Sequence, residues 1–275
     1  GIVLLFDMRD EQGLRDRHDP TLLSFLKRRA ESIEVIRGKS IDLPTTWAQL
    51  HKSLIKVRKT KGEPIRIFLD VSTCPRYYAL AVLSMCLGQG IAKSVSMFYA
   101  EGLYPNNSVA DEIFTVGHWA TIPIPGLGGL FDPGKKRFYL VSVGFEGIKT
   151  MRVVARADPD RVSILFPDPA VKSEYKKRSA ENNADLIRGF KIPETQIVRA
   201  HAADAIGAWR ALSNKDIERS ESENTFYLCS GTKPHSIALA LRAISLKYPA
   251  VLYNLPGEHK VVDIQSNRKY CRYDV

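Results

Sequence analysis

Short apolar runs alternate with longer amphipathic stretches along most of this chain. Runs rich in Val, Ile, Leu and aromatic residues predict buried strands, and apolar residues at helical spacing predict helices. The predicted strands cover residues 2–6, 33–36, 65–69, 95–99, 137–143, 161–166, 196–198, 225–228 and 250–254. The predicted helices cover residues 20–30, 47–58, 148–156, 174–189 and 202–212. Two further Ala/Leu-rich helices follow the strands at 65–69 and 225–228, the first continuing to Cys86. This alternation is typical of an α/β protein with parallel sheets covered by helices.

A Pro/Gly-rich stretch near the middle of the chain divides this pattern. Prolines and glycines crowd into residues 121–136, as in a loop or linker, and the alternation of strands and helices restarts after it. We therefore expect two tandem Rossmann-like units with mainly parallel sheets. The first covers residues 1–120 and the second covers residues 137–275.

One phrase occurs in both halves. Residues 69–81 align without a gap on residues 228–240, and each copy reads as a strand, a turn of small residues and a helix. Pro75 and Pro234 stand where a proline is favoured in the first helical turn. Hydroxyl and backbone N–H groups of such a turn point off the carboxyl end of a strand, where α/β sheets bind ligands and helix N-termini favour anions. A single copy is typical of ordinary helix capping, whereas two aligned copies favour a duplicated site.

Charge and cysteine content narrow the classes of partner. Among the 275 residues, 40 Lys and Arg exceed 30 Asp and Glu, giving a net charge of +10, which favours a polyanionic ligand such as a nucleotide or nucleic acid. The four cysteines form no CxxC pair, so we expect reduced thiols and neither a disulfide framework nor a metal site. No apolar run is long enough to span a membrane, and we expect a cytoplasmic protein without a cofactor.

The second half resembles a known family. The residues that carry the resemblance are a small-residue turn after the first strand, Ser142 to Gly147, and the later turn Cys229-Ser230-Gly231-Thr232-Lys233-Pro234. Their order along residues 137–260 is similar to that of CRISPR-associated Rossmann-fold (CARF) sensor domains, with Ser230 in place of one glycine of the later motif. The first half then resembles a diverged copy, and two fused copies are similar to the SAVED sensors of anti-phage signalling.

The resemblance implies a function and a set of site residues. It implies a sensor in prokaryotic antiviral defence that binds a cyclic or linear oligonucleotide second messenger, or a related phosphorylated ligand, between paired domains. The effector would be a separate protein or a further segment, and the sensor could form a homo-oligomer. The ligand-binding residues on this reading are Ser72, Thr73, Arg76, Ser142, Gly144, Phe145, Glu146, Gly147, Ser230, Gly231, Thr232, Lys233 and His235. Lys233 is the leading candidate for a phosphate contact, with Arg76 as its counterpart. His235, which aligns with Arg76, is either a contact or a half-exposed helix residue.

An enzymatic alternative stays open. Lys233 could stabilise charge on a phosphate in a phosphodiesterase or nuclease, with or without a metal, and the reaction would then be slow cleavage of a cyclic oligonucleotide. The sequence offers no convincing general base, so we expect a binding protein and assign no catalytic residue. Asp168 and Glu174 are spaced too closely for a nuclease core and are better explained by a solvated helix start. Direct nucleic-acid binding, suggested by the net charge, is a third possibility.

Overall fold

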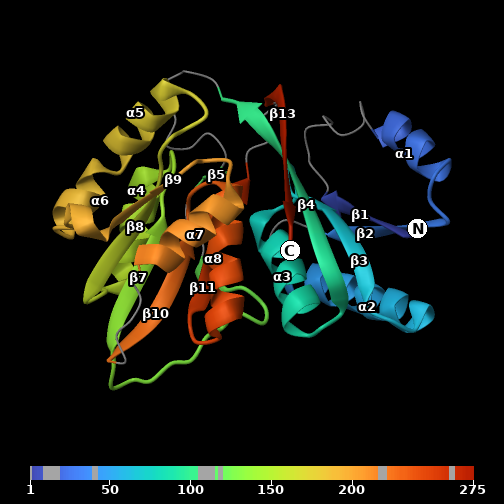
Figure 1. The fold of residues 1–275 in the computed structure, drawn as a ribbon, viewed down its shortest axis with the longest axis horizontal. Coiled ribbons are helices and arrows are strands. Elements are labelled where there is room, and N and C mark those ends of the chain that lie inside the picture. The colour runs from blue at the N-terminus through green and yellow to red at the C-terminus, as the bar shows by residue number, and fades with distance from the viewer. Residues whose placement is uncertain are drawn as a thin grey trace.

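The computed structural model describes residues 2–8, 19–38, 43–104, 115–116, 120–215, 222–259 and 264–275. It confirms the α/β class, and its two main sheets are mixed, a larger one of six strands and a smaller one of three (Figure 1). The strands of the larger sheet are β6 (Ala120–Pro123), β7 (Lys136–Ser142), β8 (Arg161–Pro167), β9 (Ile197–Ala200), β10 (Glu223–Cys229) and β11 (Ala250–Leu255). The helices that follow them are α4 (Gly147–Ala157), α5 (Ser173–Asn182), α6 (Ala184–Gly189), α7 (Ala205–Lys215) and α8 (Lys233–Leu246), with a short 3-10 helix at Glu194–Gln196.

The larger sheet is mostly parallel and has a loosely Rossmann-like strand order. Its order is β6-β11-β10-β7-β8-β9, and all neighbours are parallel except β6, which lies antiparallel on β11. The chain runs outward from β7 through β8 to β9, then crosses to β10 on the other side of β7. The strand order therefore reverses between β7 and β10, and the crevice at such a reversal is where open α/β sheets bind ligands.

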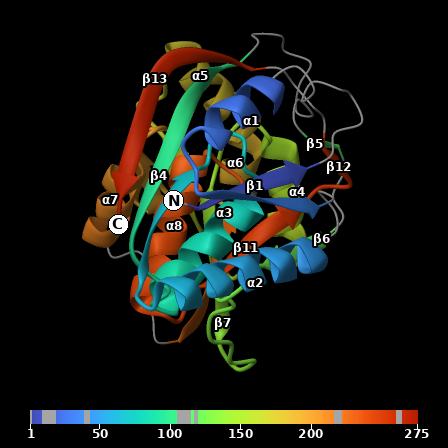
Figure 2. The same ribbon diagram turned by 90° about the vertical axis from the view of Figure 1, so that its right-hand side faces the viewer.

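The smaller sheet is built from both ends of the chain. Its strands are β3 (Ile65–Asp70), β4 (Ala92–Leu103) and β13 (Gln265–Asp274). β3 is parallel to β4, whereas β13 is antiparallel to β4 and runs alongside it (Figure 2). The remaining elements of this half are β1 (Ile2–Met8), α1 (Asp19–Lys27), β2 (Ser32–Gly38), α2 (Leu43–Lys61), α3 (Arg76–Leu83) and a π-helix at Ser84–Gly88. β1 and β2 form a separate parallel pair, and β5 (Thr115–Val116) pairs with β12 (Glu258–His259).

Two of these pairings differ from the expected organisation. β13 belongs to residues 137–275, yet it completes the sheet of the first half. β6 overlaps the predicted linker, residues 121–136, yet it forms the edge of the larger sheet. The smaller sheet is therefore mixed rather than mainly parallel, and the two sheets do not follow the expected domain bounds at these places.

The two sheets share one hydrophobic core. α3 lies on the inner face of the smaller sheet and packs against α8, which lies on the larger sheet (Figure 1). A single buried cluster accordingly runs from Met97 on β4 through Leu80 and Leu239 on these helices to Tyr227 on β10. A second cluster lies on the opposite face of the larger sheet, where α4 and α6 cover it. Burial across the α3–α8 contact holds the two halves together, because apolar area removed from water is the main stabilising contribution to folding.

Candidate functional site

The two copies of the repeated phrase form the predicted strand, turn and helix. The first copy is β3, a turn at residues 71–75 and α3; the second is β10, a turn at residues 230–232 and α8. In the second copy Thr232 caps the helix, its Oγ1 accepting a hydrogen bond from the His235 N–H at 3.3 Å, with Pro234 in the first turn. In the first copy Pro75 itself is the capping residue, so α3 begins two positions later than the alignment with α8 predicts.

The two turns contact each other by exchanging cationic side chains. Arg76, from the first copy, donates from Nη1 to the carbonyl of Cys229 and from Nη2 to the carbonyl of Gly231, each at 2.7 Å. Lys233, from the second copy, donates from Nζ to the carbonyl of Ser72 at 2.5 Å. Each copy therefore places one cation on the turn of the other, and we call this contact the turn interface.

Positive charge in the turn interface is balanced only weakly. The acceptors of Arg76 and Lys233 are neutral carbonyls, and among the described residues neither side chain forms an ion pair. The pKa of Lys233 is lowered to about 8, chiefly by burial; the Arg76 guanidinium contributes to the lowering, whereas Cys74 and Asp70 act in the opposite direction. The Nε of Arg76 is buried and has no hydrogen-bond partner among the described residues. Two close cations with neutral partners are an environment that an anion would stabilise.

The hydroxyl of Ser72 holds the first turn in place. Its Oγ accepts a hydrogen bond from the Ala100 N–H at 2.9 Å, and its own N–H donates to Asp70 Oδ1 at 2.8 Å. These two contacts orient the Ser72 carbonyl toward Lys233. The neighbouring Thr73 is exposed to solvent and makes no contact in the turn interface.

The crevice between β7 and β10 is filled by main chain. Ser142 is fully buried, and its Oγ accepts a hydrogen bond from the Gly231 N–H at 3.0 Å and donates to the Leu228 carbonyl at 3.3 Å. A Cβ on Gly231 would lie 2.8 Å from the carbonyl oxygen of Val143, and one on Gly144 would lie 3.4 Å from the Gly231 Cα. Ser142 and the two glycines therefore bring the turns after β7 and β10 into direct contact.

Aromatic side chains border the turn interface on the side of α5. Tyr104, Phe145 and Tyr175 form a cluster whose ring centroids lie 5.6–5.8 Å apart in edge-to-face geometry. The Tyr104 N–H donates to the hydroxyl of Tyr175 at 2.8 Å, which joins the end of β4 to α5. The Arg178 guanidinium lies 4.7 Å from the Phe145 ring centroid. Phe145 thus belongs to a platform made by both halves.

Two asparagines hold the turn after β7 and divide the predicted helix at 174–189 into α5 and α6. Asn182 donates to the Phe145 carbonyl at 2.6 Å, and Asn183 donates to the Gly144 carbonyl at 2.7 Å. A Cβ on Gly147 would lie 1.7 Å from the carbonyl oxygen of Asn182. Gly147 is therefore required for the close approach of α4 to this junction and is not positioned to contact a ligand.

Glu146 and Tyr253 lie beside the same interface. Glu146 forms an ion pair with the buried Lys149 at 3.3 Å. Burial raises the pKa of Tyr253, the Arg76 charge acts to lower it, and the Glu146 charge adds to the increase. The Oγ of Ser230 is buried and has no hydrogen-bond partner among the described residues. A hydroxyl of this kind can hydrogen-bond a ligand at the edge of the turn interface.

The interpretation of His235 as half-exposed is wrong. The side chain is fully buried, its Nε2 lies 3.2 Å from the carbonyl oxygen of His201, and burial lowers its pKa to about 4. It is therefore a neutral core residue at neutral pH. The alignment places it opposite Arg76, but its ring lies in the core against the His201 carbonyl and not in the turn interface.

The structure thus separates the predicted site residues into two groups. Those at or beside the turn interface are Ser72, Arg76, Gly144, Phe145, Glu146, Ser230, Gly231 and Lys233. Those that instead cap a helix, pack in the interior or face solvent are Thr73, Ser142, Gly147, Thr232 and His235, although the Ser142 hydroxyl accepts the Gly231 N–H. The sequence alone did not point to Tyr104, Tyr175 and Tyr253, which lie beside these residues. Tyr253 could have been found, because it stands near the end of the predicted strand at 250–254, beside the strand that carries the second turn.

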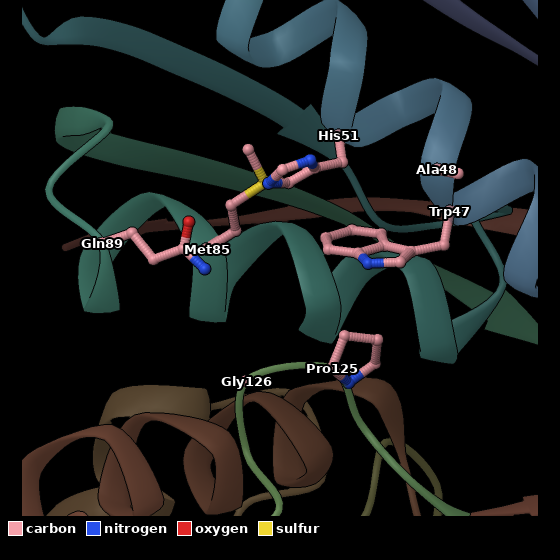
Figure 3. Close-up of a pocket in the computed structure, with 7 residues that line it drawn as sticks. All are labelled: Trp47, Ala48, His51, Met85, Gln89, Pro125 and Gly126. Carbon is pink, nitrogen blue, oxygen red and sulfur yellow. The ribbon is translucent and has the colours of Figure 1, made fainter.

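A concavity lies away from these residues. It has a volume of about 320 Å³ and is lined by Trp47 and His51 of α2, by Met85 and Gln89 at the π-helix, and by the Pro125–Gly126 loop (Figure 3). The Trp47 and His51 rings lie 5.9 Å apart. None of the residues singled out from the sequence lines it.

Asp168 and Glu174 have structural roles here, as expected for a solvated helix start. The Asp168 carboxylate forms ion pairs with Lys176 at 2.9 Å and Arg199 at 3.6 Å, and Glu174 is exposed in the first turn of α5. In the described part of the chain, no cluster of three or more His, Cys, Asp or Glu side chains is arranged to hold a metal ion. None of the described helices has the length and apolar character needed to cross a bilayer.

Comparison with known proteins gives only distant structural likenesses. Neither models of known protein families nor curated protein sequences match the chain. A protein of unknown function from Pseudomonas aeruginosa PAO1 is 10% identical, with a TM-score of 0.28 over 93% of this chain and 82% of that one. The cytoplasmic domain of a prokaryotic cation chloride cotransporter is 11% identical, with a TM-score of 0.22 over 93% of this chain and 85% of that one.

Proposed function

We propose that this protein is a sensor that binds a cyclic or linear oligonucleotide second messenger, or a related phosphorylated ligand, at the turn interface. The observation that carries the proposal is the exchange of Arg76 and Lys233 between the two turns. Among the described residues both cations donate only to neutral carbonyls, and burial lowers the pKa of Lys233 to about 8. Phosphate oxygens are stronger acceptors for these donors than carbonyls, because both partners are then charged.

The surroundings support a ligand that carries bases as well as phosphates. Phe145 and Tyr104 lie beside the turns on the α5 side, and aromatic rings are common partners of unstacked bases. The contact joins the two halves, so a ligand bound there would change how the first turn meets the second. That change is the signal we propose is passed to a separate effector in antiviral defence, in keeping with the CARF and SAVED resemblance.

Thermal unfolding in the presence of defined nucleotides tests the proposal. Cyclic di-, tri-, tetra- and hexanucleotides and their linear forms are screened separately with the full chain. A ligand at about 100 times its Kd adds about 2.7 kcal/mol to stability, which for a chain of this size raises Tm by about 5–10 °C. Chromatography of the same incubations reports cleavage, and linear products would identify the phosphodiesterase alternative.

Lys233→Met identifies the site, with Lys93→Met as the matched control. Loss of one charge-assisted contact costs about 1.5–3 kcal/mol, so the Kd should rise about 10- to 150-fold. Lys93 is an exposed lysine paired with Glu63 at 3.9 Å, far from the turns in the fold, and its variant should bind normally. A ligand whose binding is unaffected by Lys233→Met would show that it binds elsewhere.

A further inference from the structure

The outer face of the smaller sheet carries an unusual set of exposed rings. Phe68 on β3 is 67% exposed, Phe98 on β4 is 36% exposed and Tyr270 on β13 is 72% exposed. The opposite face of the same strands is apolar and covered by α3, with Met97 fully buried and Tyr273 nearly so. A solvated sheet face is ordinarily polar, so aromatic residues on three adjacent strands need a specific explanation.

The strand register places these rings together. Asp70 pairs with Phe98 and Phe98 with Arg272, so these three side chains lie in one row across the sheet. Phe68 lies one row away on β3, and its ring centroid is 6.2 Å from that of Phe98 with an interplanar angle of 26°. Tyr270 lies one row away in the other direction, opposite Ala100. The three rings therefore lie on the same face of the sheet, with Phe68 and Phe98 in contact and Tyr270 one row further along, and we call this surface the aromatic face.

Cations surround the aromatic face. The Arg272 guanidinium lies 5.7 Å from the Phe98 ring centroid, and Arg66 is exposed on β3 two residues before Phe68. Arg268 and Lys269 are exposed directly before Tyr270. The two described acidic residues of this face, Asp70 and Asp274, already have hydrogen-bond or ion-pair partners.

Asp274 binds Arg272 and Ser96, and Asp70 accepts the Ser72 N–H. Arg272 shares a row with Phe98, and Arg66 alternates with Phe68 onto the same face, while Arg268 and Lys269 lie in the irregular part of β13 beside it. The net charge of the chain is +10.

We propose that the aromatic face binds single-stranded nucleic acid. Unstacked bases stack on exposed rings regardless of sequence, while flanking Arg and Lys contact the phosphates. In a duplex the bases are stacked on one another, so these rings could contact only the sugar-phosphate backbone. An acidic protein segment would satisfy the cations, but it would not use the faces of three rings. The combination of rings and cations therefore favours a single strand over both alternatives.

This inference does not depend on the proposed function. Lys233 contacts the Ser72 carbonyl beyond the end of β3, whereas Phe68 and Tyr270 stand on the outer face of the sheet, within β3 and β13. Variants of one site should leave the other unchanged. Failure of messenger binding would say nothing about the aromatic face, and failure here would leave the turn interface untouched.

Fluorescence anisotropy of labelled oligonucleotides with the full chain tests the proposal. The probes are oligo-dT and oligo-U of about 12 nucleotides and a duplex of the same length, at low and high salt. The variants are Phe68→Ser, Tyr270→Ser and the double substitution, with Phe131→Ser as the matched control. Phe131 is 64% exposed in the loop between β6 and β7, so its substitution removes an exposed ring from another surface.

We expect single strands to bind more tightly than the duplex. Each ring removed should weaken single-strand binding about 5- to 150-fold, whereas Phe131→Ser should leave it unchanged. Arg66→Gln should reduce the salt dependence of binding by about one phosphate contact. Because Phe68 and Tyr270 are exposed, the single variants should fold, and circular dichroism checks this.

Three results would overturn the proposal. The first is equal affinity for single strands and duplex, which indicates charge alone. The second is binding that survives the loss of both Phe68 and Tyr270. The third is a wild-type dimer that Phe68→Ser converts to a monomer, since the face would then be covered by a second copy of the chain.

Discussion

Replacing Lys233 with methionine should make the ligand-free protein more stable at neutral pH. The pKa of Lys233 falls from 10.5 to about 8 on folding, chiefly because burial removes water from the ammonium. One pKa unit corresponds to about 1.4 kcal/mol, so keeping this side chain charged in the folded state costs about 3 kcal/mol. Methionine removes that cost but leaves the Ser72 carbonyl without its donor, which costs about 1–2 kcal/mol. The expected net gain is about 1–2 kcal/mol.

The gain should depend on pH in a defined direction. The pKa of Lys233 is lower in the folded state than in the unfolded state, so the unfolded state binds more protons between pH 8 and pH 10.5. Wild-type stability therefore receives a contribution that rises with pH across this window. Below pH 8 the full cost of the charge is present, and above pH 10.5 it is absent. The advantage of the methionine variant should consequently shrink as the pH approaches 10.5.

Urea unfolding followed by tryptophan fluorescence at pH 7 and pH 9.5 measures this difference. Lys93→Met is the control, because its ammonium is exposed and its loss should have no comparable pH dependence. A Lys233→Met protein that is less stable than wild type at pH 7, by an amount that does not vary with pH, would refute the reasoning. Lys233 would then be a structural hydrogen-bond donor, and the turn interface would hold no unbalanced charge for an anion.

Two further predictions concern packing and acid stability. Gly231→Ala should destabilise the protein by about 1–3 kcal/mol, because its Cβ would lie 2.8 Å from the Val143 carbonyl oxygen, whereas Gly128→Ala, which has no atom within 4 Å of its Cβ, should be neutral in urea unfolding. His235 has a pKa of about 4 in the folded state, below its ordinary value of 6.5, so wild-type stability is full above pH 6.5 and falls by about 3 kcal/mol as the pH drops to 4. His235→Leu should lack this part of the acid sensitivity, and parallel slopes of stability against pH for the two proteins would contradict it.

Local patterns predicted most elements of the larger sheet, but not the edges of either sheet. β13 shows no apolar alternation that stands out, because its outer face carries exposed Tyr270 and Arg272 and only Tyr273 is buried. β6 has four residues and ends at Pro123, so its sequence is typical of the loop we expected. Edge strands of this kind are specified by their partners, β4 and β11, which lie far away in the sequence.

The site was predictable as two turns but not as an interface. Each turn follows from a strand, small residues and a helix start, which are local features. The hydrogen bonds from Arg76 to the second turn span 153 and 155 residues, and they exist only because α3 packs against α8. The burial of His235 likewise results from tertiary packing and not from a local sequence feature. Its aligned partner, Arg76, lies at the interface, yet no local property of the two positions distinguishes them.

The asymmetry between the two copies has an electrostatic reason. In the alignment Cys74 corresponds to Lys233, and His235 corresponds to Arg76, so each copy keeps one cation and replaces the other with a neutral group. Burial raises the pKa of Cys74 to about 11 and lowers that of His235 to about 4, so both are uncharged at neutral pH. Arg76 already lowers the pKa of Lys233, and two more cations would add repulsion that buried groups cannot screen. On the proposed function, a ligand with two phosphates would therefore meet a guanidinium from one copy and an ammonium from the other.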